Sequence, residues 1–193
     1  MDKHRDLSSG SLAQHFFQIA LPAAIGMVFT TLYNVVDVFY AGLIGTEAQA
    51  GIAIAFQSFM TFITIGFGLS AAMTALIGNS IGAKDLSEAT ETATQGFGFS
   101  IAASSLLVLL AICFGPLLIE LISSEGPYRD AGTAYFMVLI LGLPAFIMSY
   151  GLNGILQAKG DTKSMQFALM VSFFSNIGLN PLLMFGIPNL WSG

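Results

Sequence analysis

The chain has 193 residues, of which 55% are hydrophobic and only 9% are charged, and its mean hydropathy is +0.79. A soluble domain carries about 25% charged residues, so this composition excludes an ordinary water-soluble globule. The net charge of −5 says little about partners, because the acids lie mostly in predicted loops. The single cysteine, Cys113, excludes an internal disulfide and a cysteine-based metal cluster. The composition indicates an integral membrane protein.

Long apolar runs alternate with short polar breaks, which predicts an all-α, polytopic helical membrane protein. A spanning helix needs about 20 apolar residues, and backbone groups in lipid must be hydrogen-bonded within their own segment. Strands of a barrel would instead read as short alternating segments. We expect one transmembrane helical domain over residues 1–193. Its five predicted spans are residues 16–44, 48–81, 93–122, 131–156 and 165–185.

The basic residues predict the orientation of these spans. With five spans, one side of the membrane receives five of the six Lys and Arg residues, and the opposite side receives only Arg129. Positive charge in short loops favours the cytoplasmic side. We therefore expect a multi-pass protein of the plasma (inner) membrane, with its N-terminus in the cytoplasm and its C-terminus outside. The five basic residues on the cytoplasmic side are Lys3, Arg5, Lys84, Lys159 and Lys163.

The stretch TTLYNVVDVFYAG, residues 30–42, places an acid inside the first span. Steps of three and four residues put Thr30, Tyr33, Asn34 and Asp37 along one helical face. An acid inside a membrane usually marks an ion pathway or a proton relay. The alternative is an acid near a helix end whose side chain reaches the headgroups. We favour the functional interpretation of Asp37.

The last predicted span carries a matching polar stripe, because Ser172, Asn176 and Asn180 recur every four residues. The first and fifth spans both run outward, so this stripe and Asp37 are expected at similar depth, in one polar cavity lined by both helices. Gln57 belongs to a weaker polar stripe on the second span. The alternative for the asparagines is simple hydrogen bonding between helices.

Proline and glycine predict two further features of the helices. Pro22 is expected to kink the first helix, and Gly78 and Gly82 in GNSIG are expected to allow close helix contact. The sequence contains no Walker-type motif, metal-ligand cluster, catalytic triad or nucleic-acid patch. We therefore expect neither an enzyme nor a nucleic-acid-binding protein.

Four stretches together resemble the multidrug and toxic compound extrusion (MATE) family. They are LYNVVDVFYAG, IGNSIGAKDLSEA, NGILQAKGDTK and SNIGLNPLLMFG, in that order along the chain. The resemblance implies a fold of twelve helices in two six-helix lobes, each lobe with a cavity. The chain is similar to the first lobe without its sixth helix and without the second lobe, so we expect part of a longer transporter, or a half completed by a second lobe or a homodimer partner.

The resemblance also implies roles for single residues. The helix-1 acid of the family matches Asp37, its tyrosine matches Tyr33 and its bending proline matches Pro22. The family pattern N-x-x-L-D-P reads NIGLNP here, so Asn176 is kept while Asn180 replaces a second acid. The proline that usually follows GDTK is also missing, because Ser164 stands in its place.

The expected function is secondary antiport, in which organic, cationic and amphipathic compounds leave in exchange for H⁺ or Na⁺. The coupling ion is the only cofactor expected, and the partners are the lipid bilayer and small organic substrates. Protonation of Asp37 from outside is expected to rearrange its hydrogen bonds to Tyr33, Asn34 and Asn176 and to let the helix bend at Pro22. The residues assigned to cation coupling are Asp37, Asn176 and Asn180, and those assigned to the substrate cavity are Tyr33, Asn34, Thr30, Gln57 and Ser172.

Two alternatives remain. In the first alternative, the chain is a non-transporting membrane assembly subunit or an inactive gene fragment. In the second, it flips lipid or polysaccharide precursors. A flippase for such precursors would need a basic cavity to hold pyrophosphate, and none of the predicted spans contains an internal Lys or Arg.

Overall fold

The structure is a computed structural model that describes residues 12–186, apart from most side chains before residue 24. The described residues form five α-helices and no strand, and all five are long and apolar enough to cross a membrane. The predicted number and order of spans are therefore confirmed. The helices are α1 (Leu12–Ile44), α2 (Thr46–Gly82), α3 (Leu86–Ile122), α4 (Pro127–Ala158) and α5 (Lys163–Phe185).

The breaks between helices are shorter than the hydropathy pattern predicts, most clearly before α3. This helix begins at Leu86 rather than at residue 93. The Asp85 carboxylate caps it by accepting a hydrogen bond of 2.9 Å from the backbone N–H of Glu88. The polar first turns of α3 are helical because of this cap, although they carry too much charge to be recognised as part of a span.

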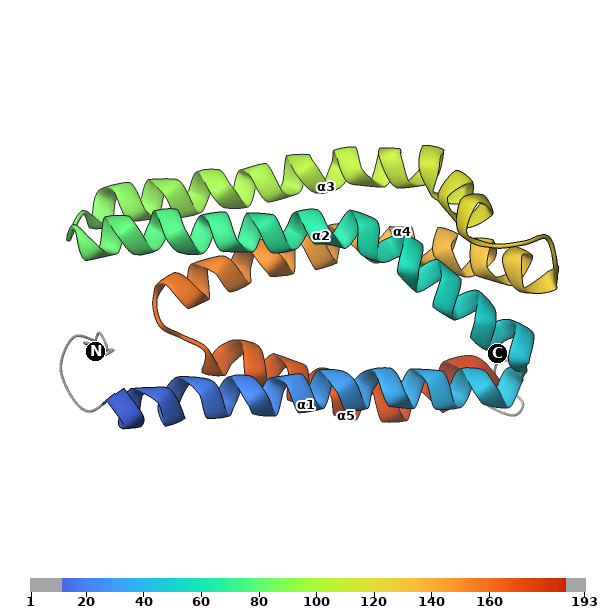
Figure 1. The fold of residues 1–193 in the computed structure, drawn as a ribbon. Helices are drawn as coiled ribbons and strands as arrows, with labels where there is room; N and C mark the ends of the chain where they lie inside the picture. Colours follow the sequence, from blue (N-terminus) through green and yellow to red (C-terminus); the bar gives the residue numbers. More distant parts are fainter. Residues whose placement is uncertain (1–11, 187–193) are drawn as a thin grey trace. The chain divides into compact units, whose positions relative to one another are not determined.

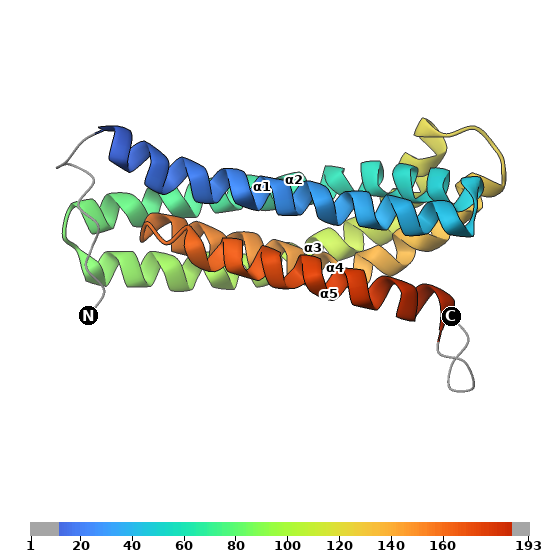
Figure 2. The same ribbon diagram turned by 90° about the horizontal axis from the view of Figure 1, so that it is seen from below.

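The chain divides into two compact units, which are described separately (Figures 1 and 2). The three-helix unit, Gly45–Lys159, holds α2, α3 and α4, and consecutive helices in it run in opposite directions. The two-helix unit, Met1–Ile44 with Gly160–Gly193, holds α1 and α5. These two helices are far apart in sequence, yet they pack side by side and run in the same direction.

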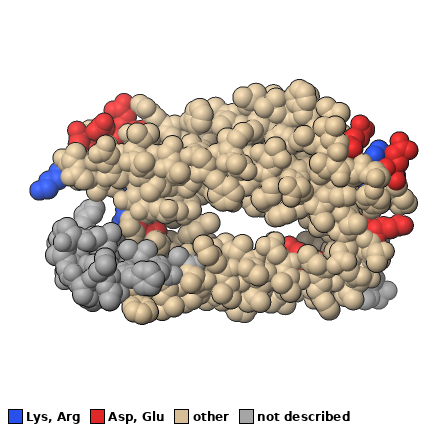
Figure 3. All heavy atoms as spheres, viewed as in Figure 1, with Lys and Arg blue, Asp and Glu red and all other residues tan. Residues whose placement is uncertain are grey.

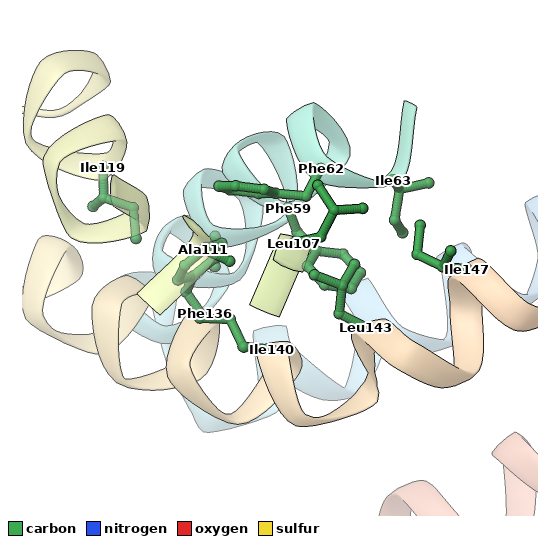
Figure 4. Packing of buried hydrophobic residues seen from close by; sticks show 11 residues of the cluster. Phe59, Phe62, Ile63, Leu107, Ala111, Ile119, Phe136, Ile140, Leu143 and Ile147 are labelled. Carbon is green, nitrogen blue, oxygen red and sulfur yellow. The ribbon is translucent and has the colours of Figure 1, made fainter. Parts of the chain in front are cut away.

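The core of the three-helix unit is made of aromatic and aliphatic side chains from all three helices (Figure 4). Phe59 of α2 and Phe136 of α4 are almost completely buried, and Leu107 of α3 lies between the same helices. The backbones of α2 and α4 come very close at Gly51 and Gly132. A Cβ atom added to Gly51 would lie 2.8 Å from the backbone nitrogen of Gly132, so only glycine fits there.

The glycines predicted to form close contacts are a different pair, and for them the prediction is wrong. Among the residues that the structure describes, a Cβ atom added at Gly78 or at Gly82 would have no neighbouring atom within 4 Å. The close approach of α2 to α4 occurs instead at Gly51 and near Ser70, whose backbone oxygen would lie 2.7 Å from a Cβ at Gly154. The spacing of glycines alone did not identify which of them face a neighbouring helix.

Charged side chains of the three-helix unit gather at its two ends, as Figure 3 shows. Asp85, Glu88 and Glu91 are exposed at one end, and Glu120 and Asp130 are exposed at the other. The stretch between the two ends is uncharged on α2, α3 and α4, which fits the apolar core of a bilayer. The orientation stays a prediction, and two of the residues behind it, Lys3 and Arg5, lie outside the described residues.

Candidate functional site

The candidate site lies in the C-terminal half of α1 and of α5, between these two helices. Asp37 is seven residues before the end of α1 at Ile44, which is roughly 10 Å along the helix axis. Its side chain is half-buried. On α5, Asn176 is buried with an exposure of 8%, whereas most of the helix is exposed. An amide of α5 and an acid of α1 thus share the best covered part of this helix pair.

Three hydrogen bonds join Asp37, Asn176 and Asn180 into a closed triad. The Nδ2 of Asn176 donates to Oδ1 of Asp37 at 2.7 Å, and the Nδ2 of Asn180 donates to the same oxygen at 2.8 Å. Nδ2 of Asn180 also donates to Oδ1 of Asn176 at 3.2 Å. The one-turn spacing of the asparagines is the physical reason that both amides reach the same carboxylate.

Tyr33 lies one turn before Asp37 on the same face of α1 and completes this group. Its phenol shares a hydrogen bond with the side chain of Asn176 and lies close enough to Asp37 to interact with its charge. The amide of Asn176 is therefore in contact with both polar side chains of α1.

Aromatic side chains flank the triad along the helix pair. Toward the start of both helices, Phe29 packs edge-on against Phe173, with ring centroids 5.5 Å apart, and is also in contact with Phe174. Toward the other end, the rings of Tyr40 and Phe185 lie 6.4 Å apart. The polar triad thus lies between aromatic contacts on both sides along the helix pair.

A second polar contact between the two helices was not anticipated from the sequence. The side-chain amide of Gln166, in the first turn of α5, lies directly over Gly26 of α1, in the space that a Cβ atom at Gly26 would occupy. Oε1 of Gln166 is buried and has no hydrogen-bond partner among the described residues. A glycine facing a long amide four residues into a helix gives no periodic signal, which is why the pattern did not reveal it.

The other predicted cavity residues are not part of the triad. The hydroxyl of Thr30 donates to the backbone oxygen of Gly26 at 3.0 Å, and Nδ2 of Asn34 donates to the backbone oxygen of Thr30 at 2.9 Å. The expected hydrogen bond between Asn34 and Asp37 stays a prediction, since the described bond of the Asn34 amide is to its own helix. Ser172 is exposed one turn before Asn176.

The remaining two predicted residues are Gln57 and Pro22. Gln57 is exposed on α2 and so belongs to the three-helix unit. Helix α1 continues through Pro22, but the side chain of Pro22 lies outside the described part of the chain. The roles predicted for both residues in the cavity and in bending stay predictions.

Chemically, the triad is a single titratable carboxylate surrounded by hydrogen-bond donors. Within the described residues, no group of three or more His, Cys, Asp or Glu side chains could hold a metal ion. A half-buried carboxylate that is hydrogen-bonded between two helices is able to gain or lose one unit of charge, and such a change alters contacts on both helices at once.

Comparison with known proteins finds similarity over most of the chain. The family model MatE matches residues 22–182. The chain is 25% identical over 186 residues to a protein named FAD transporter from Shewanella oneidensis, covering 96% of this chain and 41% of that protein. It is also 25% identical over 172 residues to a probable multidrug resistance protein NorM from Oceanobacillus iheyensis, covering 89% of this chain and 38% of that protein.

Solved structures agree with the sequence comparison on the fold. A MOP superfamily transporter from Pyrococcus furiosus aligns with a TM-score of 0.86 at 24% identity, over 95% of this chain and 41% of that one. The chain thus spans about two fifths of the length of the curated relatives that it matches. Because the family model covers most of its residues, from Pro22 to Leu182, the chain belongs to the MatE family.

Proposed function

We propose that this chain is part of a secondary antiporter that exports organic, cationic and amphipathic compounds in exchange for H⁺ or Na⁺, with Asp37 as the coupling carboxylate. Members of the family are transporters and not enzymes. The observation that carries the proposal is the placement of Asp37, whose carboxylate is bound by Asn176 and Asn180 inside the membrane-spanning part of the helix pair.

The proposed mechanism uses the charge of Asp37 as a switch. Ionised Asp37 attracts a cationic substrate, because the attraction between opposite charges is stronger in a low-dielectric site than in water. Uptake of a cation from outside removes that attraction and weakens the hydrogen bonds from the two amides, since these bonds are strongest to a charged acceptor. Tyr33 follows because it shares a hydrogen bond with Asn176. Thr30, Asn34 and Ser172 are proposed to line the substrate cavity, and Pro22 is proposed as the hinge of α1.

The relatives differ in the cargo that their names state, so the class of substrate is part of the proposal. One is named for FAD, which carries a negatively charged diphosphate, and another for multidrug resistance. Helix α5 has Lys163 as its first residue and no other basic residue, and α1 from Ala24 to Ile44 has none. An acid without a nearby base favours cations over FAD and over pyrophosphate-linked precursors.

Transport in everted membrane vesicles tests the coupling role of Asp37. Vesicles that contain the chain together with a second lobe are energised with a proton or sodium gradient, and accumulation of the fluorescent cation ethidium is recorded. We expect Asp37→Asn to abolish gradient-driven accumulation, while Ser105→Ala on α3 keeps it, because the exposed Ser105 hydroxyl is bound to its own helix and has no proposed role in the cavity. Undiminished transport by Asp37→Asn would reject the proposal.

The same vesicles separate the alternatives. Transport of FAD in place of ethidium would support an anionic cargo, and transport of neither by a well-inserted chain would support a non-transporting subunit or fragment.

The orientation proposed for the plasma membrane is tested with single cysteines at Lys84 and at Glu125, after replacement of Cys113. A membrane-impermeant thiol reagent added from the periplasmic side should label only the cysteine at position 125.

A further inference from the structure

The two amides of the triad present the same kind of atom to the carboxylate. Both Asn176 and Asn180 direct Nδ2 toward Oδ1 of Asp37, at 2.7 and 2.8 Å. The bond from Nδ2 of Asn180 to Oδ1 of Asn176 fixes this arrangement, because turning either amide around would break it. We propose that these paired donors make Asp37 selective for a proton over a sodium ion, and that Asn180 is the residue that sets this selectivity. The inference rests on the proposed coupling role of Asp37.

A sodium ion needs oxygen atoms around it, as hard cations do. At Oδ1 of Asp37 it would meet the positive N–H ends of two amides instead of their oxygens. To offer oxygens, the side chains of Asn176 and Asn180 would both have to turn, and both hydrogen bonds to Asp37 would be lost. Bonds from amides to a charged carboxylate are among the stronger ones, so this rearrangement opposes sodium binding.

A proton requires no such rearrangement. No hydrogen bond occupies Oδ2 of Asp37 among the described residues, so this oxygen is available to form the new O–H bond. After protonation at Oδ2, Oδ1 is a carbonyl oxygen with two lone pairs, and it still accepts both N–H groups. The triad keeps its hydrogen-bond partners while the carboxylate loses its charge. The hydrogen bonds weaken without changing partners.

Asn180 also limits the charge of the site to one. Ionisable groups near Asp37 on its own helix are the phenols of Tyr33 and Tyr40, and the only ionisable residue of α5 is Lys163, its first residue. A carboxylate at position 180 would add acceptor oxygens and a second negative charge, both of which favour a metal cation. The amide supplies N–H donors instead, so one monovalent charge per cycle is exchanged at this site.

Infrared difference spectroscopy on the 193-residue chain in lipid nanodiscs tests this inference without requiring transport. The C=O band of the protonated Asp37 carboxyl, identified by its absence in Asp37→Asn, is titrated against pH in 150 mM NaCl and in 150 mM KCl, which are concentrations on the order of physiological ionic strength. For the natural chain we expect equal midpoints in the two salts. For Asn180→Asp we expect Na⁺ to lower the midpoint by about one pH unit relative to K⁺, which is a tenfold competition.

Each outcome bears on one claim. A sodium-dependent midpoint in the natural chain, as large as that in Asn180→Asp, would overturn the selectivity but leave Asp37 as a coupling residue. A spectrum without any band that depends on Asp37 would instead count against the proposed function. If Asn180→Asp fails to fold, the comparison of Na⁺ with K⁺ in the natural chain still decides whether Asp37 prefers the proton. The matched control is Asn153→Asp on α4, the same amide-to-acid change in the three-helix unit, which should leave the Asp37 midpoints equal in the two salts.

Discussion

Aromatic and branched side chains from three helices fill a common core in Gly45–Lys159, whereas buried positions are few in the helix pair of α1 and α5. Among the described residues of that pair, only Gly26, Ala41 and Asn176 are buried. The three-helix unit is held by close packing, as expected for helices in lipid, where apolar surface alone gives no driving force. In the two-helix unit, the described contacts between α1 and α5 include hydrogen bonds around one acid and aromatic contacts on either side of it.

The largest effect is expected from a side chain added at the closest contact of the three-helix unit. In Gly51→Val, the new atoms meet the backbone of α4 at Gly132, which cannot move aside as a flexible side chain would. We expect a loss of about 1–3 kcal/mol in the free energy of unfolding, measured by thermal or denaturant unfolding in detergent. Gly78→Ala is the control, because its Cβ meets no atom within 4 Å. Equal stability of the two variants would contradict the packing described for α2 and α4.

A smaller effect is expected in the two-helix unit from Asn176→Ala. This change removes a hydrogen-bond donor to Asp37 and the partner of Tyr33. Hydrogen bonds to charged groups contribute about 1.5–3 kcal/mol each to stability. The loss is reduced because Asn180 still donates to Asp37. Proteolysis at the α4–α5 loop should become faster, while circular dichroism of the three-helix unit changes little. Ser172→Ala, one turn away on an exposed position, should behave as the natural chain. A faster cleavage of Ser172→Ala than of Asn176→Ala would contradict this account.

The smallest effect is expected at the start of α5. The hydroxyl and the backbone N–H of Ser164 donate to the Asp161 carboxylate at 2.6 and 3.0 Å, and these bonds lower the pKa of Asp161. Since the pKa is lower in the folded chain, the stabilisation is present above the unfolded value of about 3.9 and is lost as pH falls through the folded value.

Ser164→Ala should therefore raise the pKa of Asp161, because the hydroxyl bond is the largest cause of the shift. The titration is followed by NMR of the Asp161 side-chain carbonyl carbon. The control is Thr162→Val, since the Thr162 side chain makes no capping hydrogen bond. A pKa that moves in Thr162→Val and stays constant in Ser164→Ala would show that the loop is arranged differently.

The sequence predicted the five spans well because apolar runs of this length are compatible with few structures besides a spanning helix. It missed the start of α3, since Asp85 extends the helix into a polar stretch that hydropathy reads as a loop. The missing proline after GDTK also has a local physical reason. A proline at position 164 would have no N–H to give, whereas Ser164 donates two hydrogen bonds to Asp161.

The candidate site was predictable as far as helical spacing reaches. Spacing and depth brought Asp37 together with Asn176 and Asn180, and the structure joins these three. Spacing also placed Asn34 on the same face. A polar side chain in a helix competes for hydrogen bonds to its own backbone, and the Asn34 amide donates to the backbone oxygen of Thr30. The contact of Gln166 with Gly26 depends on how two helices approach, which one-dimensional patterns do not encode.

The most direct test of the central claim is to observe the side-chain amides of α5 while Asp37 titrates. In selectively ¹⁵N-asparagine-labelled chain, the Nδ2–H resonances of Asn176 and Asn180 should move together with one midpoint as pH changes, because both donate to Oδ1 of Asp37. The resonances of Asn34, bound to its own helix, should stay in place, and Asp37→Asn should abolish the movement. Resonances of Asn176 and Asn180 that do not respond to pH, or that move equally in Asp37→Asn, would contradict the account.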